Sequence, residues 1–258
     1  MFQFSEWRPG EQVALVRNET YFDAAEGGVQ PEGYIYVNLP DANVLVESFL
    51  AGDTNIIDGP AVARRAEFYA AADAGTAQVY SYPGNAWDYM AFNLADPNNP
   101  QNGLDEAGNP IDQGHHPIFG DVRVRQAIGH AVDVDAIIQS AVFGEGVRMT
   151  SFIIPASWAY ASELPAIAYD PELAAQLLDE AGWVDDDNDP STPRVAQGAM
   201  YAEDGAPLSF TLYTNEGNTR REAIGVVVQD QLTQLGFQVD FQTIDFNTLL
   251  DIMDSQTF

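Results

Sequence analysis

Residues 208–244 read LSFTLYTNEGNTRREAIGVVVQDQLTQLGFQVDFQTI, and this stretch decides the fold. Its first six residues alternate apolar and polar side chains, which predicts a strand. Thr219 to Glu222 fits a capping box, and apolar residues then follow at helical spacing until Gly236. Alternation returns after that glycine. The stretch therefore predicts a β-α-β unit with parallel strands and a right-handed crossover.

Polar side chains follow both predicted strands at the point where each should end. They are Asn215 and Asn218 after the first strand, and Asp245 with the aromatic Phe246 after the second. In an open α/β sheet, ligands bind beyond the carboxyl ends of the strands. These four residues are therefore candidate ligand-binding residues that offer amides, a carboxylate and an aromatic face. Asn and Asp also cap helices and form turns, and the residues alone leave both interpretations open.

The rest of the chain alternates predicted strands and helices, which indicates an α/β protein with mixed sheets flanked by helices. Strands are predicted as a hairpin within residues 1–22, and at 34–39, 55–58, 76–82 and 87–94. Helices are predicted from Pro40, from Pro60 towards Ala72, from Asp121, from Asp133 or Asp135, from Asp170, and over Thr248–Asp254. Polar loops are predicted at 96–120 and 184–206.

The charge balance excludes several classes of function. The chain has 39 acidic and 10 basic residues, all of the latter arginine, for a net charge of -29. Such a surface repels phosphate backbones and anionic headgroups, so we expect neither a nucleic-acid partner nor a membrane-surface partner. The absence of cysteine excludes disulfides and thiol chemistry. The acidic, lysine-free composition also raises the hypothesis of a salt-rich habitat, where ions screen the carboxylates.

No motif for catalysis, a metal or a cofactor is found, so we expect no cofactor and no metal site. His115 and His116 are adjacent, and adjacent side chains in an extended loop point apart. His130 lies in a predicted helix and is expected to be a packing residue. The alternative function is an exported hydrolase that acts through a carboxylate pair, because 39 acidic residues allow such pairs by chance.

The middle of the chain is similar to the sequence pattern of a known family. DVRVRQAI at 121–128, with AVD at 131–133 and II at 137–138, is similar to the family signature DVRVRQAIxxAIDRxxII. DPE at 170–172 with LLDEAGW at 177–183 resembles the family helix YDPxxAxxLLxEAGW. The first of these matches is the more specific, since chance agreement over that length is improbable.

Segments nearer the two ends extend this resemblance over nearly the whole chain. FSEWRPG at 4–10 and VRN at 16–18 resemble a strand pair, with Glu19 where the family usually has proline. Residues 49–57 resemble a helix-strand segment, and QDQLTQLG at 229–236 resembles IQxQLxxIG. The family is the family 5 solute-binding proteins of ABC importers, which includes dipeptide-, oligopeptide- and nickel-binding members.

The resemblance implies a periplasmic-binding-protein-like fold of type II, with two lobes, of which this chain is a piece truncated at both ends. Residues 1–92 would be part of the first lobe and 93–258 part of the second. The protein would be the substrate-binding component of an ABC importer rather than an enzyme. It would capture a peptide or another polar solute between lobes that close by a hinge, and deliver it to the membrane permease as a monomer.

The resemblance also implies site residues and a location. Trp87 and Tyr89 match the aromatic segment that enters the cleft before a hinge asparagine, here Asn93. Asn215 falls in the polar turn that lines the cleft, and Phe246 matches an aromatic after the second strand of the β-α-β unit. The location would be extracytoplasmic, either periplasmic or lipid-anchored at the cell surface, with the export signal outside this sequence. The ligand stays open among peptides, nickel complexes, sugars and opines.

Overall fold

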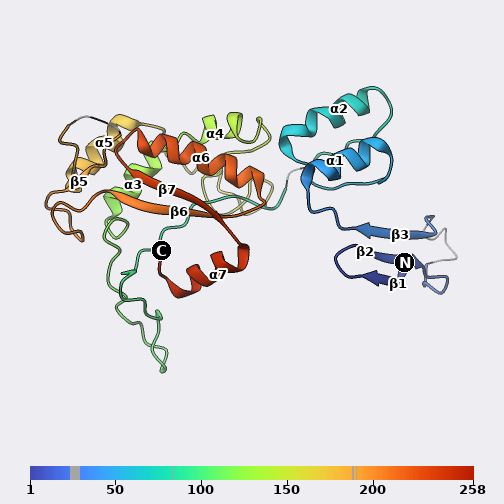
Figure 1. Cartoon of the computed structure of the whole chain (residues 1–258), viewed down its shortest axis with the longest axis horizontal. Coiled ribbons are helices and arrows are strands. Elements are labelled where there is room, and N and C mark those ends of the chain that lie inside the picture. Colours follow the sequence, from blue (N-terminus) through green and yellow to red (C-terminus); the bar gives the residue numbers. More distant parts are fainter. Residues whose placement is uncertain (24–29, 83, 188, 190) are drawn as a thin grey trace. The chain divides into compact units, whose positions relative to one another are not determined.

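The computed structural model describes residues 1–23, 30–82, 84–187, 189 and 191–258 (Figure 1). The chain forms two compact units, which we call unit 1 (Met1–Gln78) and unit 2 (Val79–Phe258). The division falls after residue 78 rather than near residue 92, so residues 79–92 belong with unit 2. How the two units correspond to lobes of a whole protein stays a prediction.

Unit 1 contains an antiparallel sheet and two helices. The strands β1 (Phe2–Arg8), β2 (Gln12–Arg17) and β3 (Gly33–Val37) lie in that order, and the predicted hairpin is confirmed. Helix α1 (Ala42–Ala51) begins where expected, because the Asp41 carboxylate accepts hydrogen bonds from the next free backbone N–H groups. A 3-10 turn, η2 (Val62–Arg64), then leads into α2 (Arg65–Asp73), later than the predicted start at Pro60.

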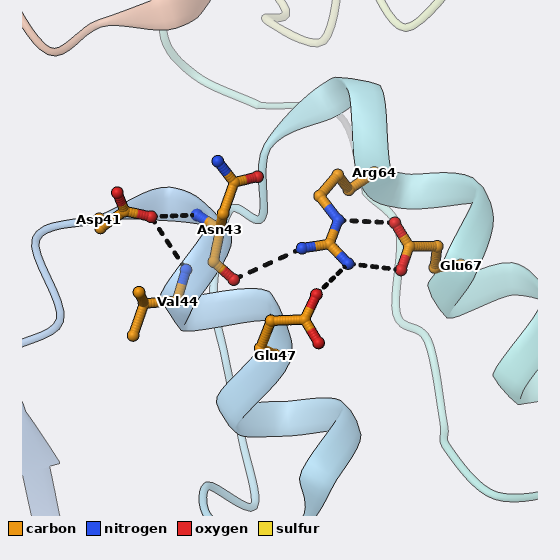
Figure 2. A network of polar contacts seen from close by, with 6 residues as sticks. All are labelled: Asp41, Asn43, Val44, Glu47, Arg64 and Glu67. Atoms are coloured by element: carbon orange, nitrogen blue, oxygen red, sulfur yellow. Dashed lines mark hydrogen bonds and ion pairs between the residues drawn. The ribbon is translucent and has the colours of Figure 1, made fainter.

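Arg64 joins the two helices of unit 1 (Figure 2). Its Nη2 atom lies 2.6 Å from a carboxylate oxygen of Glu47 on α1, and its Nε atom lies 2.6 Å from one of Glu67 on α2. The rings of Phe49 and Phe68 pack beside this network with centroids 5.5 Å apart. One guanidinium and one aromatic pair therefore hold α1 against α2.

Unit 2 is built around the predicted β-α-β stretch, and the parallel pairing of its strands is confirmed. Strand β6 (Ser209–Asn215) pairs with β7 (Gln238–Ile244) in parallel, and α6 (Thr219–Thr233) connects them (Figure 1). Gly225 is needed within α6, because a Cβ there would lie 2.2 Å from the ring of Phe241 on β7. The small residue lets the helix lie directly on the strand pair.

The described part of unit 2 has six further elements, most of which contribute to its apolar core. They are α3 (Val122–Ala131), α4 (Val134–Ser140), α5 (Pro171–Glu180), β4 (Trp183–Val184), β5 (Val195–Ala196) and α7 (Phe246–Ser255). Buried side chains of α3, α5 and α6 belong to one apolar cluster with the strand pair, and Val124, Ile128, Leu178 and Leu232 are almost fully buried in it. Asp121, Asp133 and Asp170 cap α3, α4 and α5 as expected. Within the described residues, no helix has the length and apolar character needed to cross a bilayer.

Several sequence-based expectations are wrong. Residues 55–58, 76–82 and 87–94 contain no strand in the part of the chain that the structure describes. Alternation of side chains gives a segment strand propensity, but a strand also needs a ladder partner, and no neighbouring strand pairs with these segments there. The polar loop at 184–206 carries the short antiparallel pair β4–β5.

Candidate functional site

The candidate site lies at the carboxyl edge of the β6–β7 pair. The last residue pair in register is Asn215 with Ile244, and the backbone N–H of Glu216 donates a 2.8 Å hydrogen bond to the Ile244 carbonyl. Asn215 and Asp245 therefore leave the sheet at the same edge. This is the placement that parallel strands impose on the residues that follow them.

Two of the predicted residues cap helices at this edge. Asn218 Oδ1 accepts a 3.1 Å hydrogen bond from the backbone N–H of Arg221, so Asn218 is the N-cap of α6, one residue before the predicted Thr219. Asp245 is the N-cap of α7 and accepts from Asn247 at 2.9 Å. The capping role that the sequence left open is thus present at both positions, and a role in ligand binding would come in addition to it.

Phe246 and the segment around residue 88 add exposed aromatic surface. Phe246 begins α7 and is 53% exposed, while Trp87 is 40% and Tyr89 67% exposed. Aromatic side chains that stay open to solvent can stack on a ligand, and their indole or phenol groups can also form hydrogen bonds. The three rings are therefore available for contact.

An ion-pair cluster ties the segment around Trp87 and Tyr89 to the start of α6. The Asp88 carboxylate lies 2.9 Å from Arg220 Nε and 3.0 Å from Arg221 Nε. Arg221 Nη1 also donates a 3.0 Å hydrogen bond to Asn215 Oδ1. The structure therefore connects the neighbour of both predicted aromatics to the predicted amide Asn215.

Sequence reasoning missed the three charged residues of this cluster. Asp88 and Arg221 are 133 positions apart, so no spacing rule relates them. A signal was present in Arg220 and Arg221, because two of the chain's 10 basic residues lie side by side at a predicted helix start. Positive charge beside a helix N-terminus is also unfavourable unless an acid compensates, and Asp88 is that acid.

Asn93 makes its hydrogen bonds outside this ion-pair cluster. It is buried, and its Nδ2 group donates to the carbonyls of Gln256 at 3.1 Å and Phe258 at 2.8 Å. Its Oδ1 atom accepts from the Ala95 backbone at 3.1 Å. The Asn93 amide therefore holds backbone segments together, and these hydrogen bonds do not involve Asp88, Arg221 or Asn215.

The histidines have structural contacts. His116 Nδ1 accepts hydrogen bonds from the backbone N–H groups of Ile118 at 3.0 Å and Phe119 at 3.1 Å. Burial lowers the pKa of His116 to about 4, against a smaller opposing effect of the Asp96 charge, so the ring is neutral at pH 7. His130 Nδ1 lies 2.8 Å from the carbonyl of Ala168. In the described parts of the chain, no group of three His, Cys, Asp or Glu residues could hold a metal ion.

Carboxyl groups with shifted pKa values do not favour acid-base catalysis. Hydrogen bonds lower the pKa of each of four carboxyls, those of Glu67, Asp105, Asp121 and Asp189. A hydrolase that uses a carboxyl pair needs one acid whose pKa is raised, so that it stays protonated near neutral pH. These four groups shift in the opposite direction.

Comparison with known proteins places the whole chain in one family. The family model described as "Bacterial extracellular solute-binding proteins, family 5 Middle" matches residues 1–258. The "Oligopeptide-binding protein AppA" of Bacillus subtilis is 32% identical over 255 residues, which are 98% of this chain and 40% of that protein. A "Probable ABC transporter-binding protein" of Deinococcus radiodurans is 26% identical over 99% of this chain and 41% of its own length.

Solved structures show the same fold. The structure of Bacillus subtilis AppA in complex with a nonapeptide matches with a TM-score of 0.60 and 31% identity, over 98% of this chain and 43% of that one. Lactococcal OppA, complexed with an endogenous peptide in the closed conformation, matches with a TM-score of 0.72 and 21% identity, over 98% and 43%. The chain thus has a part of a two-lobed, periplasmic-binding-protein-like α/β fold, and spans less than half the length of these relatives.

Proposed function

The chain belongs to family 5 of the bacterial extracellular solute-binding proteins, and we propose that it is part of the substrate-binding component of an ABC importer. The whole protein captures a peptide or another polar solute and delivers it to the membrane permease. It works as a monomer outside the cytoplasm, either in a periplasm or lipid-anchored at the cell surface. Its role is binding rather than catalysis.

The observation that carries this proposal is the edge of the β6–β7 pair. Asn215 offers an amide there, and Trp87, Tyr89 and Phe246 offer exposed rings. Binding sites for small polar ligands combine aromatic surface with a few positioned polar groups. A peptide is the first candidate ligand, because the relative with 32% identity is named as an oligopeptide-binding protein.

A thermal-shift screen of the whole protein tests the proposal. The probes are a nonapeptide, shorter peptides, an oligosaccharide and Fe(III)-EDTA, each at several concentrations. A ligand that binds only the folded state stabilises it by about 2.7 kcal/mol at 100 times its Kd, so the peptide should raise the melting temperature in a concentration-dependent way.

Three variants locate the effect. Phe246→Ala and Asn215→Ala should weaken the shift, whereas Phe152→Ala, which removes an exposed aromatic outside the candidate site, should leave it unchanged. If no probe shifts the melting temperature, the proposed binding role fails for these ligand classes. A shift that Phe152→Ala removes as well would place binding elsewhere.

A further inference from the structure

We infer that Asp88 is a positioning residue, which holds Trp87 and Tyr89 at the edge of the β6–β7 pair through Arg221. The inference deepens the proposed function and rests on it for its meaning. Its main test needs no ligand, because it concerns the order of the aromatic segment itself.

The contacts of residues 88–92 alternate along the chain. Asp88 turns to α6, its side chain is 26% exposed, and Met90 and Phe92 pack against the core of unit 2. Trp87 precedes Asp88 in the sequence, Tyr89 lies between Asp88 and Met90, and both aromatic side chains stay exposed. Successive side chains of an extended segment point to opposite sides, so anchoring Asp88 presents both rings to solvent.

Asp88 adds a polar anchor to this segment, in which no strand ladder provides one. Residues 84–94 form no strand. Asp88 instead makes polar contacts with α6 through both arginines. The anionic side chain also faces the N-terminus of α6, where the helix dipole favours negative charge.

Arg220 and Arg221 differ in the contacts that they make besides those with Asp88. Arg221 donates to Asn215 Oδ1 as well as to Asp88, and its own backbone N–H donates to the Asn218 cap. Arg220 contacts the same carboxylate, but its buried Nε has no partner with hydrogen-bond geometry. Arg221 therefore links Asp88 to Asn215 by hydrogen bonds to both side chains. Arg220 carries the same charge one residue away and serves as the control.

Fluorescence quenching of Trp87 tests the inference directly. The background variant carries Trp7→Phe and Trp158→Phe, which leaves exposed Trp87 and buried Trp183 as the tryptophans. Trp87 is only 40% exposed while the segment is anchored, so Asp88→Ala, which releases the segment, should uncover the ring further and raise its acrylamide quenching. Asp88→Glu keeps the charge and should restore much of this partial shielding. The unfolding midpoint should fall only slightly, since the side chains of Asp88, Arg220 and Arg221 are 26%, 42% and 41% exposed and ion pairs that water reaches contribute little to stability.

The arginine variants and a ligand measurement complete the test. Arg221→Gln should reproduce the quenching change, and Arg220→Gln should give a smaller one. Unchanged quenching in Asp88→Ala, or equal effects of the two arginine variants, would overturn the inference.

For any peptide probe that binds the parent chain, the apparent Kd should rise in Asp88→Ala in inverse proportion to the fraction of molecules whose aromatic segment stays ordered. An unchanged Kd would also overturn the inference. If no probe binds the parent, the proposed function fails, while the quenching result still decides whether Asp88 positions the segment.

Discussion

Unit 1 and unit 2 are held together by different means. Among the described residues of unit 1, Val46 and Phe68 are the buried apolar side chains, and Arg64 bridges the two helices with two glutamates. Unit 2 has a large apolar core that includes parts of α3, α4, α5 and α6 and of both parallel strands. Unit 2 should therefore depend on apolar burial, and unit 1 on polar contacts that water, salt and protons can reach.

The ion-pair clusters of the units also have opposite composition. In unit 1 one guanidinium holds two carboxylates (Figure 2), and in unit 2 one carboxylate, that of Asp88, holds two guanidiniums. The first arrangement is easy to form in a chain of net charge -29. The second concentrates scarce arginines beside exposed aromatics, which is why we connect it with ligand binding rather than with stability.

The largest effect is expected from the core of unit 2. Leu178→Ala removes a fully buried side chain of α5 and should destabilise unit 2 by about 2–5 kcal/mol, since transfer and cavity costs add. Fluorescence of the buried Trp183 follows the unfolding of this unit in urea. Leu250→Ala, at a partly exposed position of α7, is the control and should cost far less. Equal losses would contradict the view that burial carries unit 2.

The next largest effect is expected from acid, which should destabilise the two units over different pH ranges and act first on unit 2. The folded-state pKa of His116 is lowered by burial to about 4, against about 6.5 in an unfolded chain. Between these values the unfolded state binds a proton that the folded state does not, so stability falls as the pH falls. The loss should reach about 3 kcal/mol near pH 4.

An asparagine provides the control for this acid response. Asn Oδ1 in His116→Asn can accept the backbone hydrogen bonds of Ile118 and Phe119 without titrating. Urea unfolding followed by Trp183 between pH 7 and pH 4 should show a smaller slope in this variant. The same slope in both proteins would assign the acid response to other groups.

The sequence predicts an element of this protein well where the residues that the element contacts lie nearby in the chain. The β6–α6–β7 unit is predicted well, because both strands and the helix between them lie within one stretch. Caps such as Asp41 and Asp170 are also local, because their partners lie two or three residues away. At the start of α6 two capping residues are adjacent, and the choice of Asn218 over Thr219 depends on backbone geometry.

The errors occur where partners are distant or missing. Residues 76–82 and 87–94 have strand-like alternation, which does not say whether another strand lies beside them. The candidate site was predicted only in part. The edge containing Asn215 and Asp245 follows from parallel pairing, but the contact of Asp88 with Arg221 joins residues 133 positions apart.

Salt should affect the two units unequally. Repulsion among excess carboxylates destabilises the folded state, and added KCl screens it, so the melting temperature of the chain should rise with KCl. The gain should be smaller in unit 1, because salt also screens the Arg64 ion pairs. Hydrogen exchange of α1 and α2, compared with α3 and α5, measures the two responses separately. A melting temperature that does not rise with KCl would contradict both this prediction and the hypothesis of a saline habitat.

The smallest effect is expected at Glu67, where acid should act on unit 1 in a lower pH range. The hydrogen bond from Arg64 lowers the pKa of Glu67 below its ordinary value. The stabilisation is therefore complete above the pKa of an unfolded glutamate, about 4.3, and is lost as the pH falls through the lowered value. Arg64→Gln should reverse this dependence, because it leaves Glu47 facing Glu67. Amide protection at the start of α2, corrected for the intrinsic pH dependence of exchange, should therefore be lower than in the parent at pH 7 and recover towards pH 4. The matched variant Arg17→Gln removes an arginine that pairs with Glu19 on an exposed surface, and should leave α2 unchanged. If both variants loosen α2 equally, net charge rather than the Arg64 bridge holds unit 1 together.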